Sequence, residues 1–300
     1  AFLDSRFNLS FDFYSNTTYD MLMSVNLPPS VGTTSMNVNF GQLNNKGLDL
    51  SLSAQIIRNK DWFWSMTLTG GHVMDQIRKI SQGLKNDIDN PYDSSKPKIL
   101  FVEGGSQYDI YAMRSAGIDP ATGKEIFIKK NGEYTFKYDE NERVAVGNTN
   151  PILQGSWMNT VRYKGFSISL ATSYTFGSDC YNSTLKNKVE NIDLDYNVDR
   201  RVFTDRWKQP GDHTRFLGIG TSSSSSQYSE RFVEKRNELY ISSIQVMYDF
   251  APKAITRLGL RKLAIGFGLS DIAHISTVKF ERGTDYPYCR GINLIFRPTF

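Results

Sequence analysis

Apolar and polar residues alternate along this chain over lengths of about ten residues, and this is its most informative pattern. From Phe7 to Phe13, for example, every second residue is apolar and every residue between is polar. Successive side chains of a strand point to opposite faces, so such a segment predicts a β-strand with one apolar and one polar face. Eight segments show this alternation and are predicted to be strands: residues 7–13, 48–56, 62–69, 157–163, 166–176, 244–250, 263–269 and 292–300.

Two kinds of β-protein have such strands. In a soluble β-sandwich the apolar face packs inward and the polar face meets water. In a membrane β-barrel the apolar face meets lipid and the polar face lines the lumen. Alternation alone does not separate the two.

The connections between the strands favour the barrel. Three are predicted to be long, roughly 15–46, 74–153 and 178–237, and they alternate with short ones at 58–61, 164–165 and 252–260. Sandwiches rarely contain such long loops. Outer-membrane barrels have long loops outside the cell and short turns in the periplasm.

Aromatic residues cluster beside the short turns. Trp62 and Trp64 follow one turn, Tyr248 and Phe250 precede another, and Phe300 ends the chain on the same side. These positions match the aromatic girdle of a membrane interface. Ordinary core aromatics are the alternative interpretation.

The chain ends in GINLIFRPTF. Its Gly291, Leu294, Phe296 and terminal Phe300 resemble the C-terminal signal of bacterial outer-membrane barrels. That resemblance implies recognition by the barrel-assembly machinery.

The order of motifs resembles the C-terminal region of the SusC/RagA family of TonB-dependent transporters. The resemblance covers most of the chain and is less close at 86–103, at 210–240 and in the penultimate strand, LAIGFGLSDIAHIST. The stretches that carry it are FLDSRFNLSFDFYSNTTYDMLMSVNLPPSVG, NFGQLNNKGLDLSLSAQII, MRSAGIDPATGKEIF, VGNTNPILQGSWMNTVRYKGFSISLATSYTFG and DRWKQPGD.

This resemblance implies an all-β fold, an antiparallel transmembrane barrel of about 22 strands closed around an N-terminal plug. Residues 1–300 would then be the C-terminal eight strands of a single barrel domain, with the plug and the earlier strands upstream. A closed barrel of only eight strands is the structural alternative. The N-terminus, AFLDSRFNLS, lacks the basic and apolar regions of a signal peptide, so we expect that signal upstream as well.

The resemblance also implies a function: active import of oligosaccharide or peptide nutrients across the bacterial outer membrane. Partners would be outer-membrane lipid, a SusD-like surface lipoprotein, and TonB acting through the missing plug. The long loops would be extracellular and the C-terminus periplasmic. Two alternatives stay open, a structural or adhesive outer-membrane barrel without transport and a soluble carbohydrate-binding β-sandwich.

Composition narrows the choice further. No run of 18 or more apolar residues occurs, which excludes a transmembrane helix. The net charge of +4 is mild and the basic residues are scattered, so nucleic-acid binding is not expected. The three histidines lie in unrelated segments and no G-x-S-x-G motif occurs, so we predict no metal site, no cofactor and no catalytic residues.

Ligand contacts are expected from aromatic residues of the loops, because Trp and Tyr stack on sugar rings and also suit peptides. Trp207 is the first candidate, followed by Tyr92, Tyr108 and Tyr228. The alternative is that Trp207 anchors its own loop.

Overall fold

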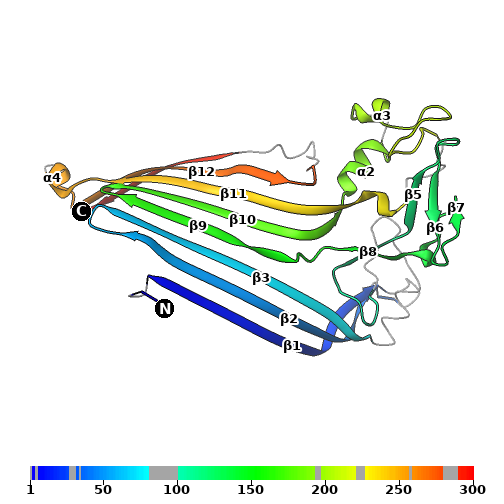
Figure 1. Cartoon of the computed structure of the whole chain (residues 1–300), viewed down its shortest axis with the longest axis horizontal. Helices are drawn as coiled ribbons and strands as arrows, with labels where there is room; N and C mark the ends of the chain where they lie inside the picture. The colour runs from blue at the N-terminus through cyan, green and yellow to red at the C-terminus, as the bar shows by residue number, and fades with distance from the viewer. Residues whose placement is uncertain are drawn as a thin grey trace.

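The computed structural model describes residues 2–3, 6–26, 32–33, 35–80, 101–192, 197–220, 227–256, 259–279 and 290–300. Its main feature is one sheet of eight strands, each antiparallel to its neighbours (Figure 1). In spatial order the strands are β1 (Phe7–Asn26), β2 (Ser35–Arg58), β3 (Trp62–Ile80), β9 (Leu153–Tyr163), β10 (Phe166–Tyr181), β11 (Val233–Asp249), β12 (Lys262–Ser276) and β13 (Gly291–Thr299).

All eight predicted strands are therefore present, and they pair in the order in which they follow in the chain. The ladder begins at β1 and ends at β13, and no pairing among the described residues joins these two edges. The described residues therefore form an open sheet and not a closed eight-stranded barrel. A β-sandwich is excluded as well, because the eight strands form a single sheet rather than two packed ones.

The strands are longer than the alternation predicts. β1, β2 and β3 contain 20, 24 and 19 residues, about twice the expected ten. The prediction of a long connection over roughly 15–46 is wrong, because β1 and β2 stay paired as far as Asn26 and Ser35. In the same way β3 extends to Ile80 and β10 to Tyr181.

The register gathers apolar residues on one face and polar residues on the other. One apolar row crosses six strands through Trp64, Val161, Ile168, Val246, Phe267 and Leu294. The neighbouring row on the opposite face is Ser65, Thr160, Ser169, Gln245, Gly268 and Asn293. The pattern predicts this division, and the register confirms it.

A mainly aromatic row lies at the end of the sheet that carries the short turns. It runs through Trp62, Tyr163, Phe166, Tyr248, Ile265 and Phe296. Ring centroids are 4.2 Å apart for Trp62 and Tyr163 and 4.5 Å apart for Phe166 and Tyr248. The C-terminus lies at this end of the sheet (Figure 1). The predicted grouping of aromatics beside the turns is thus present.

The turns themselves are short, as predicted. The Asn59 side chain accepts hydrogen bonds from the backbone N–H groups of Asp61 and Trp62, which fixes the turn from β2 to β3. Lys164, with φ of +52°, turns the chain from β9 to β10. A short helix, α4 (Pro252–Ile255), lies between β11 and β12.

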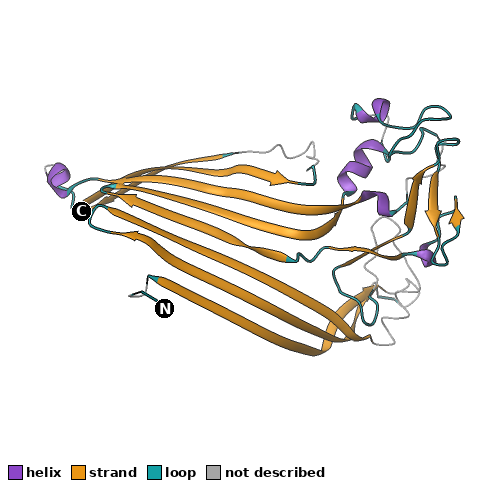
Figure 2. Cartoon of the chain, viewed as in Figure 1, coloured by secondary structure: helices purple, strands orange, loops and turns teal. Residues whose placement is uncertain are grey.

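Two inserted segments form a separate layer at the far end of the sheet (Figure 2). The one between β3 and β9 contributes β4 (Asp109–Ala112), β5 (Arg114–Ile118), β6 (Glu125–Ile128), β7 (Tyr134–Thr135), η2 (Glu140–Glu142) and β8 (Val144–Asn148). The one between β10 and β11 contributes α2 (Ser183–Val189), α3 (Arg201–Thr204) and η3 (Glu230–Phe232). We call this layer the loop platform.

A hydrophobic cluster stabilises the loop platform rather than the sheet. It consists of Leu185, Val189, Phe216 and Phe232, with Tyr181 packed against it. Most described side chains of the sheet are exposed or half-buried instead, with Leu43, Ala54 and Ile77 among the exceptions. None of the described helices combines the length and the apolar character needed to cross a membrane.

Candidate functional site

The two segments of the loop platform are joined by backbone contacts. Met113, which follows β4 and is fully buried, pairs with Ser229 just before η3. Its carbonyl accepts a hydrogen bond of 3.1 Å from the N–H of Glu230. The two inserted segments are thus joined by direct backbone contacts between residues more than a hundred positions apart in the chain.

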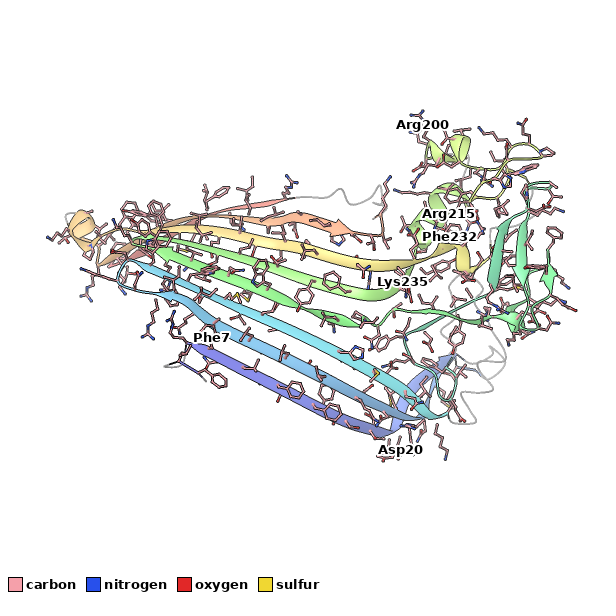
Figure 3. All side chains as sticks on the ribbon, viewed as in Figure 1. Phe7, Asp20, Arg200, Arg215, Phe232 and Lys235 are labelled. Carbon is pink, nitrogen blue, oxygen red and sulfur yellow. The ribbon has the colours of Figure 1, made fainter. Side chains whose placement is uncertain are left out.

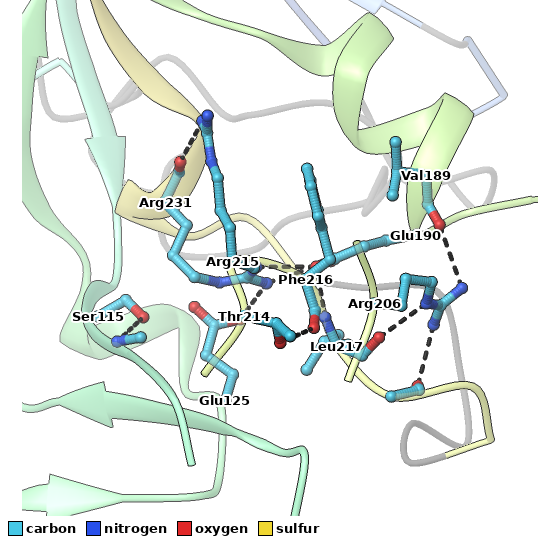
Figure 4. A network of polar contacts seen from close by, with 12 residues as sticks. Ser115, Glu125, Val189, Glu190, Arg206, Thr214, Arg215, Phe216, Leu217 and Arg231 are labelled. Atoms are coloured by element: carbon cyan, nitrogen blue, oxygen red, sulfur yellow. Dashed lines mark hydrogen bonds and ion pairs between the residues drawn. The ribbon is translucent and has the colours of Figure 1, made fainter. Parts of the chain in front are cut away.

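A buried ion triad reinforces this joint (Figure 4). The guanidinium of Arg231 lies 2.8 Å from a carboxylate oxygen of Glu125, on β6, and 2.8 Å from one of Glu190, at the end of α2. These three side chains are 6%, 4% and 0% exposed. Breaking a buried pair of this kind leaves an uncompensated charge, so the triad holds the two segments together.

The electrostatics of the triad favour its charged form. Burial on its own disfavours the Arg231 cation, but its hydrogen bonds to Glu125 and Glu190 hold the pKa of Arg231 above the ordinary value. Glu190 also accepts a hydrogen bond from the backbone N–H of Leu217. One carboxylate thus fixes η3, α2 and the 213–218 loop at once.

Arg206 performs a similar role with backbone acceptors only. Its buried guanidinium donates to the carbonyl groups of Leu217, Val189 and Gly218 at 2.7, 3.1 and 2.9 Å. These bonds tie the chain after α3 to the end of α2. They provide hydrogen-bond donors for carbonyl groups that regular secondary structure does not satisfy in this loop.

Lys186, on α2, lies beneath the ring of Tyr228. Its ammonium group is 4.1 Å from the ring centroid, and the residue is only 4% exposed. Burial lowers the pKa of Lys186 to about 8, although Glu190 and Glu125 act in the opposite direction. This lysine therefore titrates within a pH range that a folded protein tolerates.

Trp207, the first predicted ligand contact, joins the two segments of the loop platform. Its indole N–H donates to the carbonyl of Pro120 at 2.9 Å. Its ring lies against Gly123, where any added side chain would collide with it. Asp119 shapes this turn by accepting hydrogen bonds from Ala121 and Thr122.

The other predicted contacts have different surroundings. Tyr108 is 43% exposed just before β4. Tyr228 contacts Lys186, and its ring lies tilted against that of Tyr181, with 5.4 Å between ring centroids. Tyr92 lies outside the described residues. A ligand role for Trp207, Tyr92, Tyr108 and Tyr228 stays a prediction.

A cleft in the loop platform opens beside α2 and α3. It encloses about 510 Å³, and its walls combine cationic, anionic and hydroxyl groups from both inserted and strand residues. Its members include Arg201, His213, Arg215, Glu234 and Lys279. Arg215, which lies near α2 (Figure 3), pairs with Glu234 at 2.7 Å, so part of the charge in this cleft is compensated internally.

A second cavity lies in the sheet, on its polar face, and we call it the wall cavity. It encloses about 310 Å³ and is lined by Ser173, Tyr174, Thr175, Glu238, Tyr240 and His274. In the register, Ser173 faces Tyr240, which faces His274. One row lower, Thr175 faces Glu238, which faces Ser276.

Polar contacts organise the wall cavity. One oxygen of Glu238 lies 3.5 Å from Nε2 of His274 and accepts a 3.4 Å hydrogen bond from the Ser276 hydroxyl. The hydroxyl of Tyr240 donates to Asp271. The rings of Tyr240 and His274 meet edge to face at 5.9 Å.

The sequence did not reveal these groups. Glu238 and Tyr240 precede the predicted strand at 244–250, and His274 follows the predicted strand at 263–269. The triad residues Glu125, Glu190 and Arg231 come from distant segments without any shared spacing. The unusual sequence of the penultimate strand was the one available signal, since it contains both Asp271 and His274.

Comparisons with known proteins agree on one family. A sequence profile described as "TonB dependent receptor-like, beta-barrel" matches residues 2–192. TonB-dependent receptor P39 of Formosa agariphila is 25% identical, over 89% of this chain and 30% of the relative. TonB-dependent receptor SusC of Bacteroides thetaiotaomicron is 24% identical, over 83% of this chain and 25% of the relative.

A solved structure gives the same picture of the fold. The structure of the RagAB peptide transporter superposes with a TM-score of 0.76 and 22% identity, covering 92% of this chain and 30% of that chain. The chain thus spans between 25% and 30% of the length of these similar proteins.

Proposed function

Because this chain belongs to the TonB dependent receptor-like β-barrel family, we propose that it forms part of the wall and outer loops of a transporter that imports nutrients across the bacterial outer membrane. The eight strands contribute one sector of a larger barrel. Further strands of that barrel pair with the two edge strands of this sector, β1 and β13. A sheet edge in a membrane must be paired, because its backbone groups find no water there.

The division of the sheet into two faces is the observation that carries this proposal. The face with Ile168, Val246 and Leu294 meets lipid, and the face with Ser169, Gln245 and Asn293 lines the lumen. The row of Trp62, Tyr163, Phe166 and Tyr248 sits at the periplasmic interface, where amphipathic rings bridge lipid and water.

The edge strand β13 has a role in assembly. Leu294, Phe296 and Phe300 are 85%, 65% and 80% exposed in this chain. We propose that these side chains, with Gly291, present the C-terminal signal to the barrel-assembly machinery before β13 pairs with the first strand of the barrel. We further propose that the C-terminus lies on the periplasmic side.

The loop platform is the extracellular part. We propose that it contacts a SusD-like surface lipoprotein and frames the substrate cavity, with TonB supplying energy through an upstream plug. Its buried triad supports this role, because a rigid surface loses less conformational entropy when it docks a partner. Oligosaccharides and peptides are the proposed substrate classes, and RagAB is a peptide transporter of similar fold.

The test uses the full-length protein in its native host. Deleting the gene should abolish growth on at least one oligosaccharide or peptide supplied as sole carbon source. Removing only the TonB-contacting segment should have the same effect, while the protein still fractionates with the outer membrane. A protein in the soluble fraction, or normal growth of the deletion strain on every substrate, would contradict the proposal.

A further inference from the structure

We propose that the wall cavity is a subsite for one ring of a neutral, hydroxyl-rich sugar, and that Glu238, Tyr240 and His274 are its recognition residues. This inference rests on the proposed function, in which the polar face of the sheet lines the lumen. It deepens that function, because it selects saccharides over peptides as the substrate class.

The backbone around the wall cavity departs from a regular sheet. Ser242 of β11 is skipped in the pairing with both β10 and β12, and the skipped residues of β12 are Asp271 and Ile272. Asp271 has φ of +56°, a conformation that is rare outside glycine. Bulges of this kind are found beside functional sites, where they redirect side chains.

The bulge determines which side chains reach the lumen. On the C-terminal side of the bulge, odd-numbered residues such as Ser243 and Gln245 lie on the polar face of β11. On its N-terminal side, the even-numbered Glu238 and Tyr240 lie on that face. Without the extra residue, both would turn to the apolar face, so the irregular backbone is what assembles the wall cavity.

The carboxylates of the wall cavity and its bulge already have polar partners, and these contacts favour a neutral ligand over an anionic one. Glu238 has His274 at 3.5 Å and Arg236 at 4.0 Å, while Asp271 accepts the Tyr240 hydroxyl. The side chains of Glu238 and His274 are still 17% and 27% exposed, so a ligand can reach them. An anionic ligand would be repelled by the carboxylates of Glu238 and Asp271, whereas a neutral one adds hydrogen bonds to the existing contacts.

The remaining groups match sugar hydroxyls. A sugar hydroxyl both donates and accepts, and the wall cavity offers carboxylate and hydroxyl oxygens beside an imidazole and an aromatic ring. One way for a peptide to bind a sheet is to add a strand to an open edge. Both edges of β11 are already paired, with β10 and with β12, so strand addition is not available at this point.

The experiment uses the full-length transporter purified in detergent and isothermal titration calorimetry. The probes are neutral hexasaccharides of glucose, mannose, xylose and galactose, with neutral hexapeptides as the contrasting class. We expect at least one hexasaccharide to bind. Glu238→Gln and Tyr240→Ala should each weaken that binding about tenfold, equivalent to about 1.4 kcal/mol.

Asp249→Asn is the matched control, since Asp249 is an exposed carboxylate on the same strand as Glu238, at the short-turn end of β11. Its affinity should stay within about twofold of wild type. Retained heat-modifiable mobility shows that each variant is folded. Should Tyr240→Ala fail to fold, Glu238→Gln and His274→Gln carry the test.

Three results would overturn the sugar subsite: wild-type affinity in the folded variants, binding of hexapeptides only, or no binding of any hexasaccharide. None of these affects the import proposal, which is tested separately by growth of the deletion strain. Loss of growth on peptides together with peptide-only binding would leave import standing and remove the sugar subsite.

Discussion

Single residues decide how firmly the loop platform is held, and the triad of Arg231, Glu125 and Glu190 is the clearest case. Its three charged groups are almost completely buried. Burying them is costly, and mutual hydrogen bonding offsets that cost only while all three are present. The removal of one member should therefore be more harmful than the loss of an ordinary surface ion pair.

We predict that Arg231→Met destabilises the loop platform by ~3–5 kcal/mol, because two buried carboxylates lose their common partner. Hydrogen exchange of residues 183–189 and 125–128 should rise sharply, while exchange in β9 and β10 stays slow. Arg200→Met is the control, since Arg200 is an exposed residue just before α3 (Figure 3) and its substitution should change exchange little. Unchanged protection in Arg231→Met would contradict a structural role for the triad.

Lys186 gives a prediction about pH. Burial lowers its pKa to about 8, whereas an unfolded lysine titrates near about 10.4. Between these values the unfolded state keeps a proton that the folded state has released, so stability should rise with pH in this window. Below about pH 8 both states are protonated and the contribution is constant.

The measurement compares wild type with Lys186→Met, which keeps a long apolar side chain without the charge. From pH 8 to pH 10, the free energy of opening the 183–189 helix should increase in wild type relative to the variant by ~1–3 kcal/mol. A difference between the two proteins that does not vary with pH would show that Lys186 titrates normally.

At the scale of whole strands, the alternation of apolar and polar residues predicts the strand centres but not the full strand lengths. The eight strand centres were predictable because one face is apolar and the other polar throughout. The prediction for β1 and β2 stopped where the polar pairs Asn16–Asn45 and Thr17–Asn44 interrupt the alternation, although the two strands stay paired beyond them. An extended ladder beyond the bilayer has water on both sides and needs no alternation.

The bulges set a second limit. Glu238 and Tyr240 are two residues apart, but their face depends on Ser242, which lies unpaired between the ladders. A bulge exchanges the faces on which odd- and even-numbered side chains lie, and the composition of the strand does not reveal it. For this reason the wall cavity emerges from the register and not from the predicted strands.

Neighbouring positions on β10 test which face meets lipid. Ile168→Arg places a charge on the apolar face and should cost ~2–4 kcal/mol of barrel stability at mid-bilayer depth. Ser169→Arg, one residue later on the polar face, should cost far less. Urea titration of the full-length protein in lipid vesicles provides both values. Equal costs at the two positions would contradict the assignment of the faces.

At the scale of the whole molecule, this chain divides into a sheet and a platform that are stabilised differently. The sheet is held by the backbone pairing of its strands, and among the described residues no strand pairs with the outer edge of β1 or of β13. The loop platform instead has its own hydrophobic cluster and buried ion triad. The two inserted segments contribute to the platform together, which makes their stabilities interdependent.

Interdependence leads to a prediction about loop deletions in the full-length protein. Replacing residues 101–152 by a short turn removes Glu125 and the Pro120 carbonyl that holds Trp207. Arg231 then loses one carboxylate, and Met113 no longer pairs with Ser229. We expect the second segment, 182–232, to become protease-sensitive although none of its residues has changed.

Barrel assembly should survive this deletion, because the paired strands β3 and β9 remain and the short-turn end of the sheet is untouched. The deletion variant should therefore reach the outer membrane with heat-modifiable mobility but lose co-purification with the lipoprotein and substrate uptake. Replacing residues 129–133, the β6–β7 turn at the tip, removes none of the joining contacts and is the matched control. If 182–232 stays protected after the large deletion, the platform consists of two independent loops. If uptake also stays normal, the platform takes no part in import.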